Sequence, residues 1–314
     1  MMRSATLVAI AVFFAASSAR AGGFHIDEQD ARATGRAGAV TANPWNASAI
    51  YYNPGGVGAL SGLDIDVGAT LVAPSAKFRD GTTQQETSAD DQVFVLPSAY
   101  VTYKLTEVIG LGLGFNAPFG LSLRWPESST GRTIVRDIEL RSYFISPVLG
   151  IDLSQWVPGL AVGAGPDFVP ASVRLERDIP FGNVFGNVAL SGTAFGFGAR
   201  VGVLYQPEAL KYLSFGVTYR TPVKLNVSGE ANFSAPPPFR GALPPDGDTS
   251  TSITLPQRLD AGVALHLVPE WELEADFDWT GWSSFDELRL ELPANQVATS
   301  PKNWRNTWTL RLGR

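Results

Sequence analysis

Apolar and polar residues alternate over long stretches of this chain, and this alternation predicts β-strands. The clearest stretch covers residues 271–281 and reads WELEADFDWTG. Successive side chains of a strand point to opposite faces, so one face of this stretch is apolar and aromatic while the other is almost entirely acidic. On a helix the acidic residues would be spread around the whole circumference. The stretch is therefore predicted to be a strand with one apolar and one acidic face.

The same alternation predicts ten strands in all. Five further stretches alternate regularly, with glycine, small or charged residues opposite a row of apolar ones, and four less regular stretches fit the same period. The predicted strands cover residues 63–73, 92–104, 109–115, 142–153, 160–174, 195–205, 213–220, 259–267, 271–281 and 304–312.

The connections between these strands alternate between short and long. Strands that run up and down place every second connection at the same end, so short turns gather at one end and long loops at the other. This arrangement, with aromatic residues near the strand ends, is typical of an outer-membrane barrel, whereas a soluble β-sandwich has shorter and less regular strands. We therefore expect an all-β fold, a transmembrane antiparallel β-barrel. Long loops are expected at residues 74–91, 116–141, 175–187, 229–250 and 291–303.

The first 21 residues have the pattern of a secretory signal peptide. Arg3 precedes the apolar residues 5–16, and Ala19-Arg20-Ala21 fits the small-x-small cleavage site. The apolar stretch is too short to span a bilayer core of about 30 Å as a helix. We expect cleavage after Ala21 and export to the periplasm or the outer membrane.

The composition argues against several functions. Charged residues make up 17% of the chain, below the roughly 25% of soluble domains, and cysteine is absent. His25 and His266 are the two histidines, and no Gly-x-Ser-x-Gly elbow is present, so we expect neither an enzyme nor a metal or cofactor. The 24 basic residues are outnumbered by 30 acidic ones, which argues against nucleic acid as a partner. The acidic face of residues 271–281 lacks the looped geometry that calcium prefers.

Residues 22–60 contain no clear alternating strand. Two Asn-Pro steps, at Asn43-Pro44 and Asn53-Pro54, favour turns and short helical pieces. A loose tail is one interpretation, but apolar residues such as Phe24, Ile50 and Leu60 indicate a packed element. Inside a barrel, that element would be a plug.

Short motifs of this segment resemble those of the FadL-type family. The motifs are GFHIDE at residues 23–28, GRAG at 35–38 and NPGG at 53–56, followed by NAPFGL at 116–121 and NWRNT at 303–307. One departure is glycine at residue 55, where the family usually has alanine. Weaker matches are Trp125, Gly131-Arg132 and Trp282-Ser283.

The resemblance implies an outer-membrane transporter of long-chain fatty acids or, as in TodX-like channels, aromatic hydrocarbons. It implies a barrel of about 14 strands, with residues 22–60 as a luminal hatch and residues 61–314 as the barrel. Ten strands would leave too narrow a lumen for such a hatch. We therefore expect the sequence to lack about four C-terminal strands. A natural ten-stranded barrel with the hatch outside is the alternative.

Passive transport is expected, because no nucleotide-binding motif is present. Loops 116–141 and 175–187 would capture the ligand, which would then enter a hatch-lined pocket. Movement near Asn53-Pro54 would release it through a lateral exit. The predicted ligand-binding residues in the hatch are Phe24, Ile26, Tyr51, Asn53 and Pro54, and those in the loops are Phe119, Leu121, Trp125, Phe181 and Phe185.

A fatty carboxylate would need a basic partner, and Arg200, Arg220 and Arg258 have the lumen-facing parity. They would otherwise only pair with acidic residues across the barrel interior, as buried charges require. The expected partners are a long-chain fatty acid or other hydrophobic molecule and the lipid and lipopolysaccharide of a Gram-negative outer membrane, and we expect a monomer. A general diffusion porin is the alternative class, although it would need an open lumen.

Overall fold

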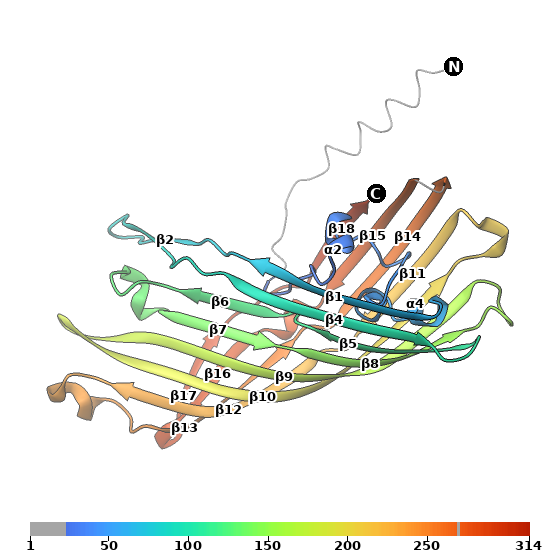
Figure 1. The fold of residues 1–314 in the computed structure, drawn as a ribbon. Coiled ribbons are helices and arrows are strands. Elements are labelled where there is room, and N and C mark those ends of the chain that lie inside the picture. The colour runs from blue at the N-terminus through green and yellow to red at the C-terminus, as the bar shows by residue number, and fades with distance from the viewer. Residues whose placement is uncertain (1–22, 269–270) are drawn as a thin grey trace, which may run out of the picture.

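Ten long antiparallel strands form one strongly curved sheet in the computed structural model, which describes residues 23–268 and 271–314 (Figure 1). The predicted signal peptide lies outside the described residues. Neighbouring strands on this path follow one another along the chain, as in an up-and-down barrel wall. In order the strands are β1 (Leu63–Val72), β4 (Phe94–Lys104), β5 (Ile109–Asn116), β8 (Phe144–Asp152), β9 (Leu160–Phe181), β10 (Val184–Tyr205), β11 (Leu213–Arg220), β14 (Arg258–Val268), β15 (Trp271–Thr280) and β18 (Thr307–Gly313).

All ten predicted strands are confirmed, but the loop prediction is partly wrong. Strands β9 and β10 each have 22 residues and meet in a tight turn, so most of the expected loop 175–187 is strand. The other four expected loops contain strands as well. Proline interrupts the alternation at Pro118, Pro222 and Pro256, because it has no N–H for the ladder, and this hid the extensions. The additional strands are β2 (Lys77–Arg79), β3 (Glu86–Ser88), β6 (Gly120–Arg124), β7 (Asp137–Ser142), β12 (Val223–Ser234), β13 (Gly247–Leu255), β16 (Glu287–Leu292) and β17 (Gln296–Pro301).

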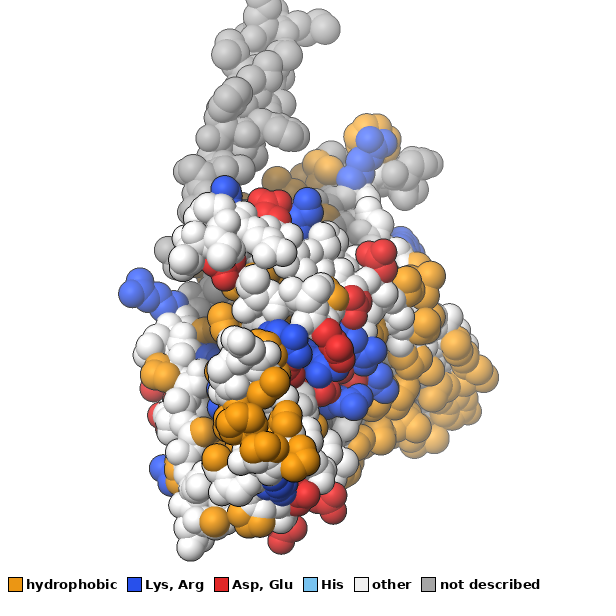
Figure 2. Space-filling view, turned by 90° about the vertical axis from the view of Figure 1, so that its left-hand side faces the viewer, with side chains coloured by type: hydrophobic (Ala, Val, Ile, Leu, Met, Phe, Trp, Pro, Cys, Tyr) orange, Lys and Arg blue, Asp and Glu red, His pale blue; other side chains and the backbone are white. Residues whose placement is uncertain are grey.

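The two faces of the wall have the predicted polarity. Trp308 and Leu310 of β18 are each 61% exposed on the convex face, whereas Asp276 of β15 is 1% exposed on the concave face. An apolar convex face requires lipid around it, as in an outer-membrane barrel. Figure 2 views the hairpin end, where hydrophobic side chains cover one flank and charged side chains gather near the middle.

The N-terminal segment lies on the concave face of the sheet (Figure 1). It contains the short helices α2 (Ala31–Gly35), α3 (Ala49–Tyr52) and α4 (Gly55–Ala59). Asp30 caps α2 by accepting the Ala33 N–H at 2.7 Å. In the part of the chain that the structure describes, no helix is long and apolar enough to cross a membrane. The 3₁₀ turns are η2 (Thr130–Thr133), η3 (Glu208–Leu210), η4 (Pro237–Ala242), η5 (Trp282–Ser284) and η6 (Pro293–Asn295).

Strands β1 and β18 end the path, and no pairing joins them among residues 23–268 and 271–314. The expectation of further strands after residue 314 stays a prediction.

Candidate functional site

Glycines on the concave face of the wall let the N-terminal segment approach the strands backbone to backbone. A Cβ on Gly110 of β5 would lie 2.2 Å from the Val57 carbonyl oxygen, and one on Gly163 of β9 would lie 1.9 Å from the Pro54 carbonyl oxygen. Helix α4 has the same requirement, because a Cβ on Gly58 would lie 2.8 Å from backbone atoms of β8. Both surfaces therefore need glycine at the contact.

The acidic face of β15 binds the backbone of the N-terminal segment. Asp276 accepts the N–H groups of Val40 at 2.9 Å and Thr41 at 3.0 Å, and Glu274 accepts that of Ala42 at 2.6 Å. Carboxylates that accept backbone N–H groups make strong, charge-assisted hydrogen bonds. The acidic residues that identified β15 as a strand therefore accept hydrogen bonds from three N–H groups of residues 40–42, which lie outside the helices and strands.

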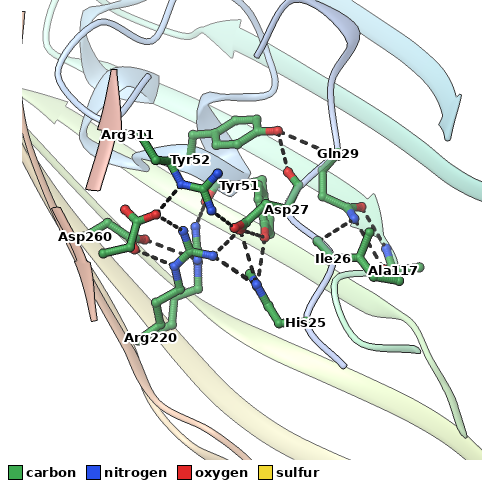
Figure 3. A network of polar contacts seen from close by, with 12 residues as sticks. His25, Ile26, Asp27, Gln29, Tyr51, Tyr52, Ala117, Arg220, Asp260 and Arg311 are labelled. Atoms are coloured by element: carbon green, nitrogen blue, oxygen red, sulfur yellow. Dashed lines mark hydrogen bonds and ion pairs between the residues drawn. The ribbon is translucent and has the colours of Figure 1, made fainter. Parts of the chain in front are cut away.

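An ionic network joins the beginning of the segment to the far wall (Figure 3). Asp27 is bound by both Arg258 of β14 and Arg311 of β18. Arg258 also contacts Asp260 at 2.5 Å and Asp278 at 3.1 Å. Because these groups are largely buried, each charge depends on its partners, and removing one partner leaves an uncompensated charge.

Burial is the largest influence on the pKa values of the residues beside this network. Burial, together with nearby arginine charges, lowers the pKa of the His25 imidazole from 6.5 to about 3, although Asp27 opposes the shift. Burial also raises the pKa of the Tyr51 and Tyr52 hydroxyls above their usual range. For Asp27, burial acts to raise the pKa, but Arg258 and the other cations outweigh it and hold the pKa well below its usual range. At neutral pH His25 is therefore neutral and Asp27 is ionised.

Residues 24–26 form backbone hydrogen bonds with the wall between the end of β5 and the start of β6. Strand β5 ends at Asn116, and Pro118 interrupts the chain before β6. The Ile26 N–H donates to the Pro118 carbonyl at 2.8 Å, and the Gly120 N–H donates to the Phe24 carbonyl at 3.1 Å. The N-terminal segment thus supplies an antiparallel bridge at the break.

The break leaves a gap in the wall between β4 and β6. Strand β5 pairs with β4 only from Ala99 onward, and β6 pairs with β7 alone among the described strands. A cavity of about 450 Å³, the side chamber, lies at this gap. It is lined among others by Phe24, Ile26, Leu96, Phe119, Leu121 and Tyr143.

A second cavity, the outer chamber, lies toward the long hairpins and has a volume of about 290 Å³. Most of its exposed surface is apolar, but Glu139, Arg174 and Lys302 are charged residues of its lining. Neither the Arg174 guanidinium nor the Lys302 ammonium group has a hydrogen bond or ion pair among the described residues. Characteristic lining residues are Phe24, Leu140, Val173, Leu190, Ile253, Leu290, Lys302 and Trp304.

Phe24 lines both chambers, so it lies between them. Its ring is held edge-on by Trp282 at 4.7 Å and contacts Trp304 at 5.7 Å and Phe119 at 6.2 Å, measured between ring centroids. Such arrangements are favourable because the positive ring edge meets the negative ring face.

The structure brings four of the predicted ligand-binding residues to the chambers and places the other hatch residues elsewhere. Phe24, Ile26, Phe119 and Leu121 line the side chamber. Tyr51 lines only a small cavity beneath the aromatic rings, described below. Asn53 and Pro54 lie in the close contact with the wall.

The remaining loop residues line neither chamber. Trp125 packs edge-on against Phe78 at 6.2 Å. Phe181 stacks on Phe239, and Phe185 lies under the Arg132 guanidinium at 4.2 Å.

The three lumen-facing arginines are paired, in accordance with the alternative interpretation. Arg200 contacts Asp167 at 2.7 Å and donates to the Ile50 carbonyl at 2.7 Å. Arg220 contacts Asp260 at 3.4 Å, and Arg258 belongs to the ionic network. Direct contact of these arginines with a ligand stays a prediction.

Sequence reasoning missed most of the outer chamber. Residues of β12, β13 and β16 line it, and none of these strands was among the ten predicted from the alternation. A signal was present, because Val223, Leu225 and Val227 alternate with polar residues, but Pro222 separates them from the preceding strand.

A barrel wall with an apolar convex face and apolar chambers inside belongs to the class of outer-membrane transport proteins. A family model described as outer membrane protein transport protein (OMPP1/FadL/TodX) matches residues 12–314. The chain belongs to this family, and it is an outer-membrane protein that transports hydrophobic compounds.

Individual relatives agree with the family match. A long-chain fatty acid transport protein of Salmonella typhi is 22% identical, covering 99% of this chain and 77% of the relative. The crystal structure of a Pseudomonas aeruginosa FadL homologue has a TM-score of 0.78 at 19% identity, covering 92% of this chain and 77% of that one. The Ralstonia pickettii toluene transporter TbuX has a TM-score of 0.74 at 18% identity, covering 89% and 80%. These structural likenesses establish the shared fold.

Proposed function

We propose that the protein carries hydrophobic compounds passively from the outer chamber, past Phe24, into the side chamber and out between β4 and β6 into the membrane. The observation that carries this proposal is that the two chambers share lining residues, namely Phe24, Leu121, Glu139 and Leu140, and that Phe24 is the member of this set from the N-terminal segment. The side chamber lies where the wall lacks a hydrogen-bonded ladder, which gives an apolar molecule a lateral way out.

The energetic reason for two chambers is the cost of exposing apolar surface to water. This cost is about 25 cal/mol per Å² of apolar surface. A continuous series of apolar surfaces is therefore a more favourable path for an apolar molecule than a water-filled pore. A general diffusion porin would need such a pore, whereas here residues 23–60 occupy the concave side of the wall.

We propose that residues 22–60 act as a hatch and that the motion is confined to its beginning. Asn53 donates to the Thr41 carbonyl at 2.7 Å and to the Val203 carbonyl at 3.0 Å, so movement near Asn53-Pro54 would break buried hydrogen bonds. Residues 23–26 are better suited, since they lie between two cavities and pair with the wall through a single bridge.

For the substrate we propose an amphipathic anion, a long-chain fatty acid. An apolar chamber with the Lys302 ammonium group free fits an apolar tail with one carboxylate. An aromatic hydrocarbon is the second candidate, favoured by the ring cluster around Phe24. We further propose that the protein works as a monomer within a lipopolysaccharide leaflet.

Filling the outer chamber tests the route. Leu190 is 8% exposed and lines the chamber, so Leu190→Trp places a large ring within it. We expect uptake of radiolabelled oleate by cells that depend on this protein to fall at least about tenfold, because the indole ring occupies volume that the ligand needs and overfilling an apolar site is unfavourable. Leu312→Trp, on the lipid-facing side at 59% exposure, is the matched control. Equal uptake by the two variants, at equal amounts of folded protein, would contradict the route.

A further inference from the structure

A small cavity lies beneath the aromatic residues, separate from both chambers. Its volume is about 20 Å³, and a cavity needs about 10–15 Å³ to hold one water-sized particle. Its polar lining comes from Arg200 of β10, Arg220 of β11 and Arg258 of β14, together with His25, Tyr51, Asp167 and Thr221. The cavity therefore has room for one particle, and arginines surround it.

One of these arginines has a buried donor without an acceptor. The Nε atom of Arg220 makes no hydrogen bond or ion pair among the described residues, whereas Arg220 Nη1 lies 3.4 Å from the Asp260 carboxylate and Arg200 Nη2 lies 2.7 Å from the Asp167 carboxylate. Arg220 is 9% exposed, so water outside the protein cannot satisfy its Nε group. A buried donor without a partner is costly, and a charged one more so. The cavity is thus shaped to receive an acceptor.

The rest of the lining decides between water and an anion. Most of its other wall is apolar and is formed by Phe119, Phe144, Val223 and Leu255. The Tyr51 hydroxyl contacts His25 at 3.2 Å, and the Thr221 hydroxyl oxygen accepts the Ala199 N–H at 2.9 Å, which leaves the Thr221 hydrogen as a donor. A water molecule needs acceptors for its two hydrogens, and the Asp167 carboxylate in the lining already accepts two hydrogen bonds, whereas an anion only needs donors.

The side chains that line the cavity carry more positive than negative charge. Three guanidinium groups and one carboxylate, that of Asp167, line it, and His25 is neutral. Asp167 accepts from Ser146 at 2.6 Å and from Arg200 at 2.8 Å. The remaining carboxylates of the network contact these arginines without lining the cavity, and they are Asp27, Asp260 and Asp278.

We propose that this cavity is a binding site for a small anion, which accepts a hydrogen bond from Arg220 Nε and lies beside the Arg200 guanidinium. The chemistry suits a halide, or one oxygen of a carboxylate that reaches the cavity. The anion would also support the N-terminal segment, since the two arginines hold the carbonyls of Tyr51 and Ile50 at the end of α3. The proposal does not depend on the transported substrate.

Bromide tests the site, because its anomalous X-ray scattering distinguishes it from water. Crystals of the full chain grown in bromide should show an anomalous peak within hydrogen-bonding distance of Arg220 Nε. Adding decanoate to the bromide crystals separates the two sources: loss of the peak, with a carboxylate oxygen in its place, identifies the anion as a substrate head group. Either result supports an anion site. A water-sized density without anomalous signal in high bromide would overturn it.

A solution measurement keeps the test independent of crystals. An anion that binds only the folded protein raises the thermal midpoint. We expect the midpoint in detergent to be a few degrees higher in chloride than in gluconate, which is too large for the cavity, at equal ionic strength. Arg220→Met should abolish this difference, whereas Arg136→Met, at a polar hairpin, should keep it. Equal midpoints of the wild-type protein in both salts would count against the proposal.

Discussion

The side chain of Asn53 donates a hydrogen bond of 3.0 Å to the carbonyl of Val203, which joins the N-terminal segment to strand β10 across 150 residues of sequence. The same amide group donates to Thr41, and its oxygen accepts the Gly55 N–H at 2.9 Å. One fully buried side chain therefore contacts three backbone groups, which are the Thr41 carbonyl, the first N–H of α4 and a carbonyl of β10.

Replacing this side chain should loosen the segment. Asn53→Ala removes the side-chain partner of the Thr41 carbonyl and of the Gly55 N–H, at a cost of about 1–3 kcal/mol for each unsatisfied group. We expect the free energy of unfolding to fall by about 2–4 kcal/mol after partial relaxation, measured by denaturant titration in micelles. Asn232→Ala, at an exposed position of β12, should change little. The same stability for both variants would show that the contact is not needed.

Replacing glycine by alanine should destabilise the protein at Gly110, where backbones are in close contact, but not at Gly35. Gly110→Ala introduces a Cβ 2.2 Å from the Val57 carbonyl oxygen and should destabilise the protein by about 1–3 kcal/mol. Gly35→Ala is the control, because nothing lies within 4 Å of a Cβ there. The thermal midpoints of both variants can be compared by differential scanning fluorimetry. A tolerated Gly110→Ala would mean that the segment can shift away from the wall.

Replacing Lys302 should weaken the binding of fatty acids but not that of neutral hydrocarbons. Lys302→Gln removes a charge-assisted hydrogen bond of about 1.5–3 kcal/mol, so the affinity for oleate should fall about tenfold or more. The affinity for toluene should stay the same, since toluene has no charge to lose. Calorimetric titration of both ligands provides the measurement, with Lys224→Gln at an exposed position of β12 as control. An equal loss for both ligands would indicate a general effect on the chamber.

Acid should destabilise the protein partly through His25. Its pKa is about 3 in the folded protein and 6.5 in the unfolded chain, so the unfolded state binds the proton more readily between these values. Stability should therefore be unaffected above pH 6.5 and should fall with pH from 6.5 toward 3, by up to about 1.4 kcal/mol per pH unit.

The variant His25→Gln isolates this contribution. It removes the titrating group, so its thermal midpoint should fall less between pH 6.5 and pH 4 than that of the wild-type protein. Asp27 and the other carboxylates titrate in both proteins and cancel in the comparison. Parallel pH profiles of the two proteins would exclude His25 as a source of the acid sensitivity.

The alternation of residues determined the wall. In residues 271–281 the period of two fixes both the strand and the side that faces lipid, because a strand cannot place neighbouring side chains on one face. The same reasoning located all ten strands of the main path, since each is long enough to show its period. It missed the other eight strands, which are short or separated from the main path by prolines and turns, and these are β2, β3, β6, β7, β12, β13, β16 and β17.

The tertiary structure alone decided what lies inside the wall. No local pattern relates Asn53 to Val203, Phe24 to Trp282 or Val40 to Asp276, because these pairs are far apart in the sequence and meet only when the sheet curves around the N-terminal segment. The sequence by itself determined which face of each strand meets lipid, since that follows from neighbours along the chain. The chambers and the paired arginines depend on the curvature and register of the whole sheet, which are global properties of the packed chain.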